Sequence, residues 1–175
     1  VKLFQNYFFE KAIAVKRIKG GVSDRIVYKI NSKNYVCTGV HNSKLKENKA
    51  FIEFSKSLKD AGFNVPEIYC VTEDGEFYLE EFAGDKSLYD LIKNYKKSPN
   101  NRIKLYKKAL SDLALIQIKG LNAVNFRYCY ETKIFNKKQI FFDFNKFHNY
   151  YLNKLTGLRF TKEQINSIKK AILKE

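Results

Sequence analysis

A glycine pair followed by polar residues is the first stretch of this chain that could do chemistry: Gly20, Gly21, Ser23 and Arg25 stand close together. Glycines let the backbone approach a ligand closely, and successive backbone N–H groups can hold the oxygens of a phosphate. An ordinary hairpin turn is the alternative, because such turns also use glycine. The pattern therefore indicates either a phosphate-binding turn or a plain connection between two strands.

A carboxylate at the start of a long helix is the second candidate. Residues 44–61 are the clearest helical pattern in the chain, and Gly62 follows them as a stop signal. The apolar side chains that define the pattern are Phe51, Phe54, Leu58 and Ala61. Glu47 falls in the first turn, where it can stabilise the helix dipole or act as a functional carboxylate. The residues alone leave both roles open.

A predicted β-hairpin that leads into a linker is the third candidate. Two β-favouring runs, 69–72 and 77–79, flank an Asp-Gly turn, which is a strong hairpin signal. The second run continues through Glu80, Glu81, Phe82 and Ala83. A glycine follows, and Asp85 or Ser87 can cap the next helix. A strand that exits into a linker and a helix is typical of the joint between two lobes.

The remaining patterns predict short strands first and helices afterwards. The predicted strands are 14–18, 26–30 and 35–40, and the further predicted helices are 3–13, 86–96, 102–118, 144–155 and one after Thr161. We expect Asp143 to cap the helix 144–155, and Thr161 with Gln164 to form a capping box. The segment 121–142 is expected to be irregular. This order predicts an α+β fold with an antiparallel sheet.

Composition bounds the possible partners. The chain has 175 residues and a formal net charge of +15, which favours an anionic partner. Most of the excess is lysine scattered over helix surfaces, as codon bias also produces, and no nucleic-acid-binding motif is present, so we expect no nucleic acid. No apolar run has the length of a membrane helix and no signal sequence is evident, so we expect a cytoplasmic protein without membrane contact. The three cysteines match neither zinc-site nor disulfide spacing.

Two of these motifs together resemble the aminoglycoside phosphotransferase and choline kinase family. The turn G-G-x-S-D-R-x-x-Y-K over residues 20–29 resembles the phosphate-covering turn of that family. The segment from VPEIY at 65–69 to FAGDKSL at 82–88 resembles its hinge, with Glu81 at the acidic position. Phe82 and Ala83 stand where Asp-Leu is usual.

Further segments resemble the sugar-kinase-like (N-acetylmuramate kinase-like) branch of the family, so the resemblance extends over nearly the whole chain. They are GVHN at 39–42, ENKAF at 47–51, DLALIQ at 112–117 and NKFHNYYLNKLTG at 145–157. The family usually carries a phosphate-binding lysine at the end of the third strand, but here that position falls near Thr38 or Gly39. Lys29, Lys44 or Lys46 would then bind phosphate, or nucleotide binding is weak or absent.

The resemblance implies a protein-kinase-like N-lobe at residues 1–83, and a hinge with a partial helical C-lobe at 84–175. It implies ATP as cofactor, with Mg²⁺ held by residues beyond 175, and transfer of phosphate to a small-molecule hydroxyl, chiefly of a sugar. The implied nucleotide-binding residues are Gly20, Gly21, Ser23, Arg25, Glu47, Glu80, Glu81, Phe82 and Ala83. Backbone groups of 80–83 would bind adenine, and Glu47 would orient the phosphate-binding group.

The catalytic loop of such a kinase, with an aspartate followed five residues later by an asparagine, does not occur in a fitting context. The chain also lacks Met and ends inside a helical pattern, so we expect a truncated, N-terminal portion that is inactive alone. A catalytically inactive pseudokinase, or a basic module that binds anions or nucleic acid, is the alternative function.

Overall fold

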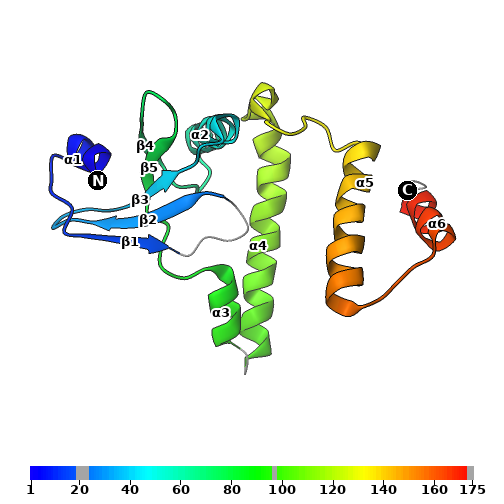
Figure 1. Cartoon of the computed structure of the whole chain (residues 1–175). Helices are drawn as coiled ribbons and strands as arrows, with labels where there is room; N and C mark the ends of the chain where they lie inside the picture. The colour runs from blue at the N-terminus through cyan, green and yellow to red at the C-terminus, as the bar shows by residue number, and fades with distance from the viewer. Residues whose placement is uncertain (19–23, 96–97, 173–175) are drawn as a thin grey trace. The chain divides into compact units, whose positions relative to one another are not determined.

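The computed structural model describes residues 1–18, 24–95 and 98–172. The chain forms two compact units, Val1–Tyr130 and Glu131–Glu175 (Figure 1). The first holds the sheet and helices α1 to α4, and the second holds helices α5 and α6. The predicted lobe boundary between residues 83 and 84 stays a prediction.

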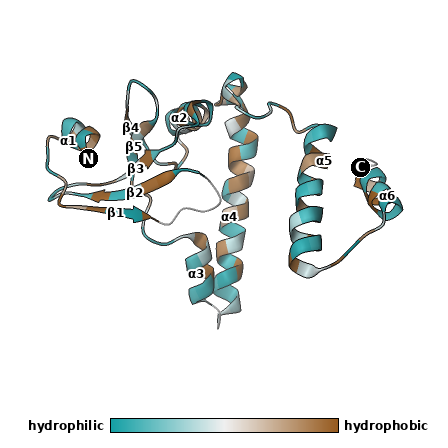
Figure 2. Ribbon diagram, viewed as in Figure 1, coloured by the Kyte–Doolittle hydropathy of each residue, from teal (hydrophilic) through white to brown (hydrophobic). Residues whose placement is uncertain are grey.

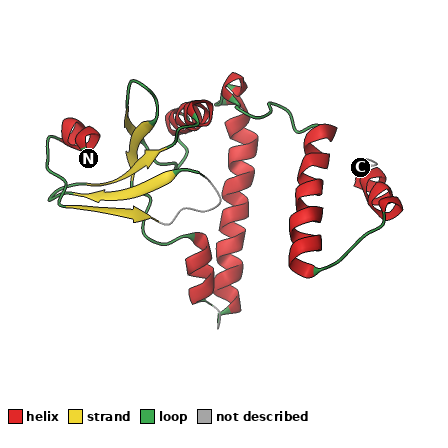
Figure 3. Cartoon of the chain, in the orientation of Figure 1, coloured by secondary structure: helices red, strands yellow, loops and turns green. Residues whose placement is uncertain are grey.

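The first unit is built on a five-stranded antiparallel sheet, as the sequence predicted (Figure 3). The strands are β1 (Ala14–Ile18), β2 (Ile26–Asn31), β3 (Val36–His41), β4 (Ile68–Val71) and β5 (Phe77–Glu81). Their order across the sheet is β1-β2-β3-β5-β4, so β3 lies between β2 and β5. The predicted α+β class is confirmed.

The turn between β4 and β5 has the predicted Asp-Gly chemistry. Gly75 has a φ of 74°, a left-handed conformation that glycine adopts without steric cost. The Thr72 hydroxyl accepts the Phe77 N–H at 3.1 Å and donates to the Asp74 carboxylate at 2.5 Å. The turn residues therefore fix the register of the two strands that lead to the linker.

The two faces of the sheet carry different helices, because alternate residues of a strand point to opposite faces. On one face α1 (Lys2–Phe8) packs its fully buried Phe4 against Ile30 and Leu79. On the other face α2 (Leu45–Asp60) packs Ile52 in a cluster with Val40 and Tyr78. We call these the α1 face and the α2 face.

A fully buried asparagine links α2 to the ends of two strands. The side-chain amide of Asn48 donates to the carbonyl oxygens of Asn42, Gly75 and Glu76 at 3.1, 2.9 and 3.1 Å. Buried carbonyl groups need such partners, because an unpaired one costs free energy. Asn48 therefore holds the first turns of α2 in place over the sheet.

Two helices follow the linker. Helix α3 (Leu88–Asn94) begins at Ser87, whose hydroxyl caps the Asp90 N–H while the Asp90 side chain accepts the Ser87 N–H. Of the two predicted caps, Ser87 is therefore correct. Helix α4 (Pro99–Lys119) has no buried residue, and Figure 2 shows hydrophobic bands along it. Two 3₁₀ turns, Gly120–Asn122 and Phe126–Tyr128, end this unit.

The first helix of the second unit begins earlier in the chain than the sequence predicted. Helix α5 (Lys137–Lys146) is capped by Asn136, whose side chain accepts the N–H groups of Lys138 and Gln139, and a π-helical segment (Phe147–Thr156) continues it. Asp143 lies inside α5, so the predicted cap is wrong. Asn136 already satisfies the first-turn amides, which moves the start upstream.

The last helix, α6 (Lys162–Ile172), has the predicted capping box: the Gln164 N–H donates to the Thr161 hydroxyl at 3.3 Å, and the Gln164 side chain accepts the Thr161 N–H at 2.9 Å.

Candidate functional site

Six of the nine predicted site residues can be placed. Gly20, Gly21 and Ser23 lie outside the described residues. Arg25 precedes β2, Glu47 is in the first turn of α2, and the remaining four residues lie at the end of β5 and just after it. The placed residues therefore come from three segments that are far apart in sequence.

Arg25 and Glu47 form a largely buried ion pair. Their Nε and Oε1 atoms are 3.3 Å apart, and their side chains are only 19% and 17% exposed. The guanidinium group also lies 4.5 Å from the centroid of the ring of Phe51, a residue of α2, and so makes a cation–π contact with this helix. Glu47 thus has a defined cationic partner, which the sequence had not identified. A buried pair of this kind fixes the geometry of both side chains, because separating them leaves a buried charge alone.

Glu80 is the second buried carboxyl of the site. It pairs with Thr38 of β3, which in turn pairs with Lys29 of β2, so the three residues form one row on the α2 face. Burial raises the pKa of Glu80 to about 7, against the opposing effect of the Arg25 charge. Its Oε2 atom is buried and has no hydrogen-bond partner among the described residues. Burial also raises the pKa of neighbouring Tyr78.

The side chain of Glu81 is occupied by structural contacts. Its carboxylate accepts hydrogen bonds from Lys59 Nζ at 3.0 Å and from the Glu67 N–H at 3.2 Å, and these bonds lower its pKa, the Lys59 bond most. Its own N–H donates to the Glu67 carbonyl oxygen at 2.8 Å. Glu81 therefore joins β5 to α2 and to the start of β4.

The linker after β5 is open on its backbone. Among the described residues, no backbone hydrogen bond is found for Phe82 or Ala83. Gly84 has a φ of 114°, which an L side chain rarely adopts, so the chain can change direction here. The peptide groups between Glu81 and Gly84 are thus able to bond a ligand.

Lys29 and Asp85 connect the sheet to this linker. Lys29 Nζ lies 2.7 and 2.9 Å from the two carboxylate oxygens of Asp85, and 4.2 Å from the centroid of the Phe82 ring. The Lys29 side chain is 21% exposed, whereas that of Asp85 is 70% exposed. Local sequence chemistry predicts Asp85 only as a possible helix cap. It gives no signal of Lys29 as a partner, because the two residues are 56 positions apart.

The other lysines considered for phosphate binding are placed differently. Lys44 pairs with Asp24 at 2.6 Å, and both side chains are more than half exposed. Lys46 is exposed in α2. Lys29 is therefore the most enclosed of the three candidates, and it shares a row with Thr38, near which the family resemblance places a lysine.

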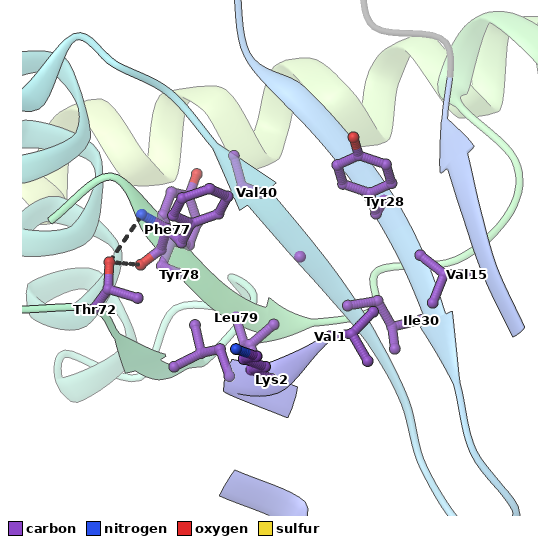
Figure 4. A pocket seen from close by; sticks show the side chains of 12 residues that line it. Val1, Lys2, Val15, Tyr28, Ile30, Val40, Thr72, Phe77, Tyr78 and Leu79 are labelled. Atoms are coloured by element: carbon purple, nitrogen blue, oxygen red, sulfur yellow. Dashed lines mark hydrogen bonds between the residues drawn. The ribbon is translucent and has the colours of Figure 1, made fainter. Parts of the chain in front are cut away.

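A separate pocket of the first unit does not coincide with these residues. An open, mostly apolar pocket of about 540 Å³ lies mainly on the α1 face (Figure 4). Its lining includes Val1, Val15, Ile30, Gly39 and Leu79. None of the six predicted site residues that the structure describes lines it. An apolar lining offers little to a phosphate, so we place the candidate site on the α2 face and linker instead.

Within the described residues, no group of three or more His, Cys, Asp or Glu side chains is arranged to hold a metal ion. The described part of the chain also has no helix that is both long and apolar enough to span a bilayer.

Comparison with known proteins adds no family assignment, because no family model and no curated protein matches the chain.

Proposed function

We propose that the unit Val1–Tyr130 is the nucleotide-binding part of an ATP-dependent phosphotransferase that acts on a small-molecule hydroxyl, chiefly of a sugar. The observation that carries this proposal is the buried Arg25–Glu47 pair. It places a cation directly after the predicted phosphate-binding turn and on the α2 side of the sheet, where the strand that leads into the open linker also presents Glu80.

The described residues fit an adenine nucleotide in two respects. The linker peptide groups of Phe82 and Ala83 can bond the polar edge of the base, because no backbone partner in the described chain takes them. Arg25 and Lys29 supply positive charge on the same side of the sheet for the phosphates. ATP, when bound, supplies the phosphoryl group that is transferred.

The roles of the chain's own residues follow from these contacts. Glu47 holds the Arg25 guanidinium, and Phe51 supports it from α2, so the cation keeps one orientation. A fixed cation stabilises phosphate charge without reorganising at the moment of reaction.

Calorimetry combined with hydrogen exchange tests the proposal. Titration with ATP, with and without Mg²⁺, should give saturable binding, and bound ATP should slow amide exchange at Phe82 and Ala83 because adenine would bond their backbone groups. Arg25→Met should weaken ATP binding about tenfold or more, since charge-assisted hydrogen bonds contribute about 1.5–3 kcal/mol. Absence of saturable ATP binding would refute the proposal.

A module that binds anions without transferring phosphate is the second candidate, since Thr38 stands near the position where the family resemblance implies a lysine. Binding of ATP, adenosine and tripolyphosphate distinguishes the two, because the chain is expected to be inactive alone. Tripolyphosphate that binds as tightly as ATP, without any binding of adenosine, would favour this second function.

A further inference from the structure

We propose that Lys29 is the principal phosphate-binding cation of this surface and that Asp85 is its built-in competitor, a latch that an incoming phosphate displaces. The inference rests on the proposed nucleotide-binding function and adds to it a specific residue and a means of control. The two residues are 56 positions apart in sequence but in direct contact.

The position of Lys29 suits a phosphate better than those of the other lysines considered. Its side chain is mostly enclosed, and it lies in one cross-strand row with Thr38 and Glu80 on the α2 face. The Phe82 ring supports the ammonium from the linker at 4.2 Å. An ammonium held in this way loses less conformational freedom when it binds an anion than a lysine on open surface does.

The latch crosses the sheet. Asp85 follows β5, whereas Lys29 belongs to β2, and β3 lies between those strands. The contact therefore draws the linker from β5 past the start of β3, which pairs with the end of β5. Gly84, with its φ of 114°, provides the change of direction that this path needs. The same segment carries the peptide groups assigned to adenine.

Asp85 competes only weakly with phosphate for Lys29, because its side chain is exposed to solvent. Its side chain is 70% exposed, and exposed ion pairs contribute little to stability because water and salt screen them. A phosphate group that carries more than one negative charge can replace it on the Lys29 ammonium. The latch should therefore lower phosphate affinity only modestly, by about two- to fivefold.

The experiment compares three probes on matched variants at one ionic strength. ATP, adenosine and inorganic tripolyphosphate are titrated into the wild type, Asp85→Asn, Lys29→Met and Lys29→Arg. Asp112→Asn is the control, because it removes the same charge from another Lys–Asp pair, Lys108–Asp112 on α4, at 2.8 Å. Thermal unfolding of each variant checks that the fold is kept.

Asp85→Asn should bind ATP and tripolyphosphate about two- to fivefold more tightly than the wild type. Lys29→Met should bind both about tenfold or more weakly, and Lys29→Arg should retain most of the affinity. Adenosine, which has no phosphate, should bind all variants alike, and Asp112→Asn should match the wild type. Enhanced binding by Asp85→Asn but not by Asp112→Asn would establish the latch.

The outcomes separate this inference from the proposed function. If ATP and adenosine bind but neither Asp85→Asn nor Lys29→Met changes the affinity for ATP, the latch is overturned and the nucleotide site stands. If neither ATP nor adenosine binds, the proposed function fails. If tripolyphosphate nevertheless binds more weakly to Lys29→Met and more tightly to Asp85→Asn, the surface is an anion site that has the latch but binds no nucleotide. Equal effects of Asp85→Asn and Asp112→Asn would reduce the result to net charge and overturn the latch.

Discussion

The buried carboxyl of Glu80 should make the stability of the protein depend on pH in an unusual direction. Burial raises its pKa from the ordinary 4.5 to about 7, so the folded state holds a proton on Glu80 that the unfolded state has released between those values. The free energy of unfolding rises with pH only where the unfolded state binds more protons. Here the folded state binds more, so Glu80 lowers the stability as the pH rises from about 4.5 to about 7.

The size of the effect follows from the pKa difference. Each pKa unit corresponds to about 1.36 kcal/mol, so a rise from 4.5 to about 7 amounts to about 3 kcal/mol. The contribution is fully present below pH 4.5 and is lost once the pH exceeds the folded pKa. Glu80→Gln keeps the shape of the protonated carboxyl but does not titrate. The variant should therefore equal the wild type near pH 4.5 and be more stable by about 3 kcal/mol near pH 8.

Urea denaturation at several pH values between 4.5 and 8 measures this difference. The difference in the free energy of unfolding between Glu80→Gln and the wild type isolates the effect of Glu80, because the other titrating groups are common to both proteins. Glu73→Gln, at an exposed position of the β4–β5 turn, is the matched control and should show no such trend. A Glu80→Gln advantage that is constant over the range, or that grows toward acid pH, would refute the reasoning about burial.

Two further substitutions test the elements around the site. Asn48→Ala should lower the free energy of unfolding by about 2–3 kcal/mol, measured by urea denaturation, because the carbonyl oxygens of Asn42 and Gly75 lose their donor, whereas that of Glu76 keeps the Asn42 N–H; a cost below about 0.5 kcal/mol would contradict this role. Gly84→Ala should cost about 1–3 kcal/mol in the same assay, because its φ of 114° strains an L side chain, and unchanged stability would show that the linker adopts another path.

Most of the secondary structure was predictable from local chemistry. The Asp-Gly turn, the alternating strands and the amphipathic pattern of residues 44–61 predicted β4, β5 and α2, and the structure confirms them. Asp143 is a case in which prediction from neighbouring residues gave the wrong helix cap. An aspartate before an apolar run looks like a cap, but Asn136 binds the first-turn amides and the helix passes through Asp143. Several residues near a helix start can act as caps, and packing decides among them.

The side-chain contacts of the candidate site could not be predicted from the sequence. The residue types in Gly20–Arg25, at Glu47 and in Glu80–Ala83 indicated phosphate and nucleotide chemistry, and that indication stays a prediction. Side-chain partners depend on which strands become neighbours. Arg25 precedes β2 and Glu47 follows β3, so the pairing of these two strands brings the two side chains together.

The sequence by itself determined where the strands, turns and helix caps of the first unit lie, because those depend on hydrogen bonds and sterics within a few residues. The tertiary structure alone decided that Lys29 meets Asp85 and that Glu80 is buried beside Arg25. Both outcomes depend on strand order and on burial under α2, and burial is what shifts a pKa or encloses a cation. These properties belong to the folded chain and to no local segment of it.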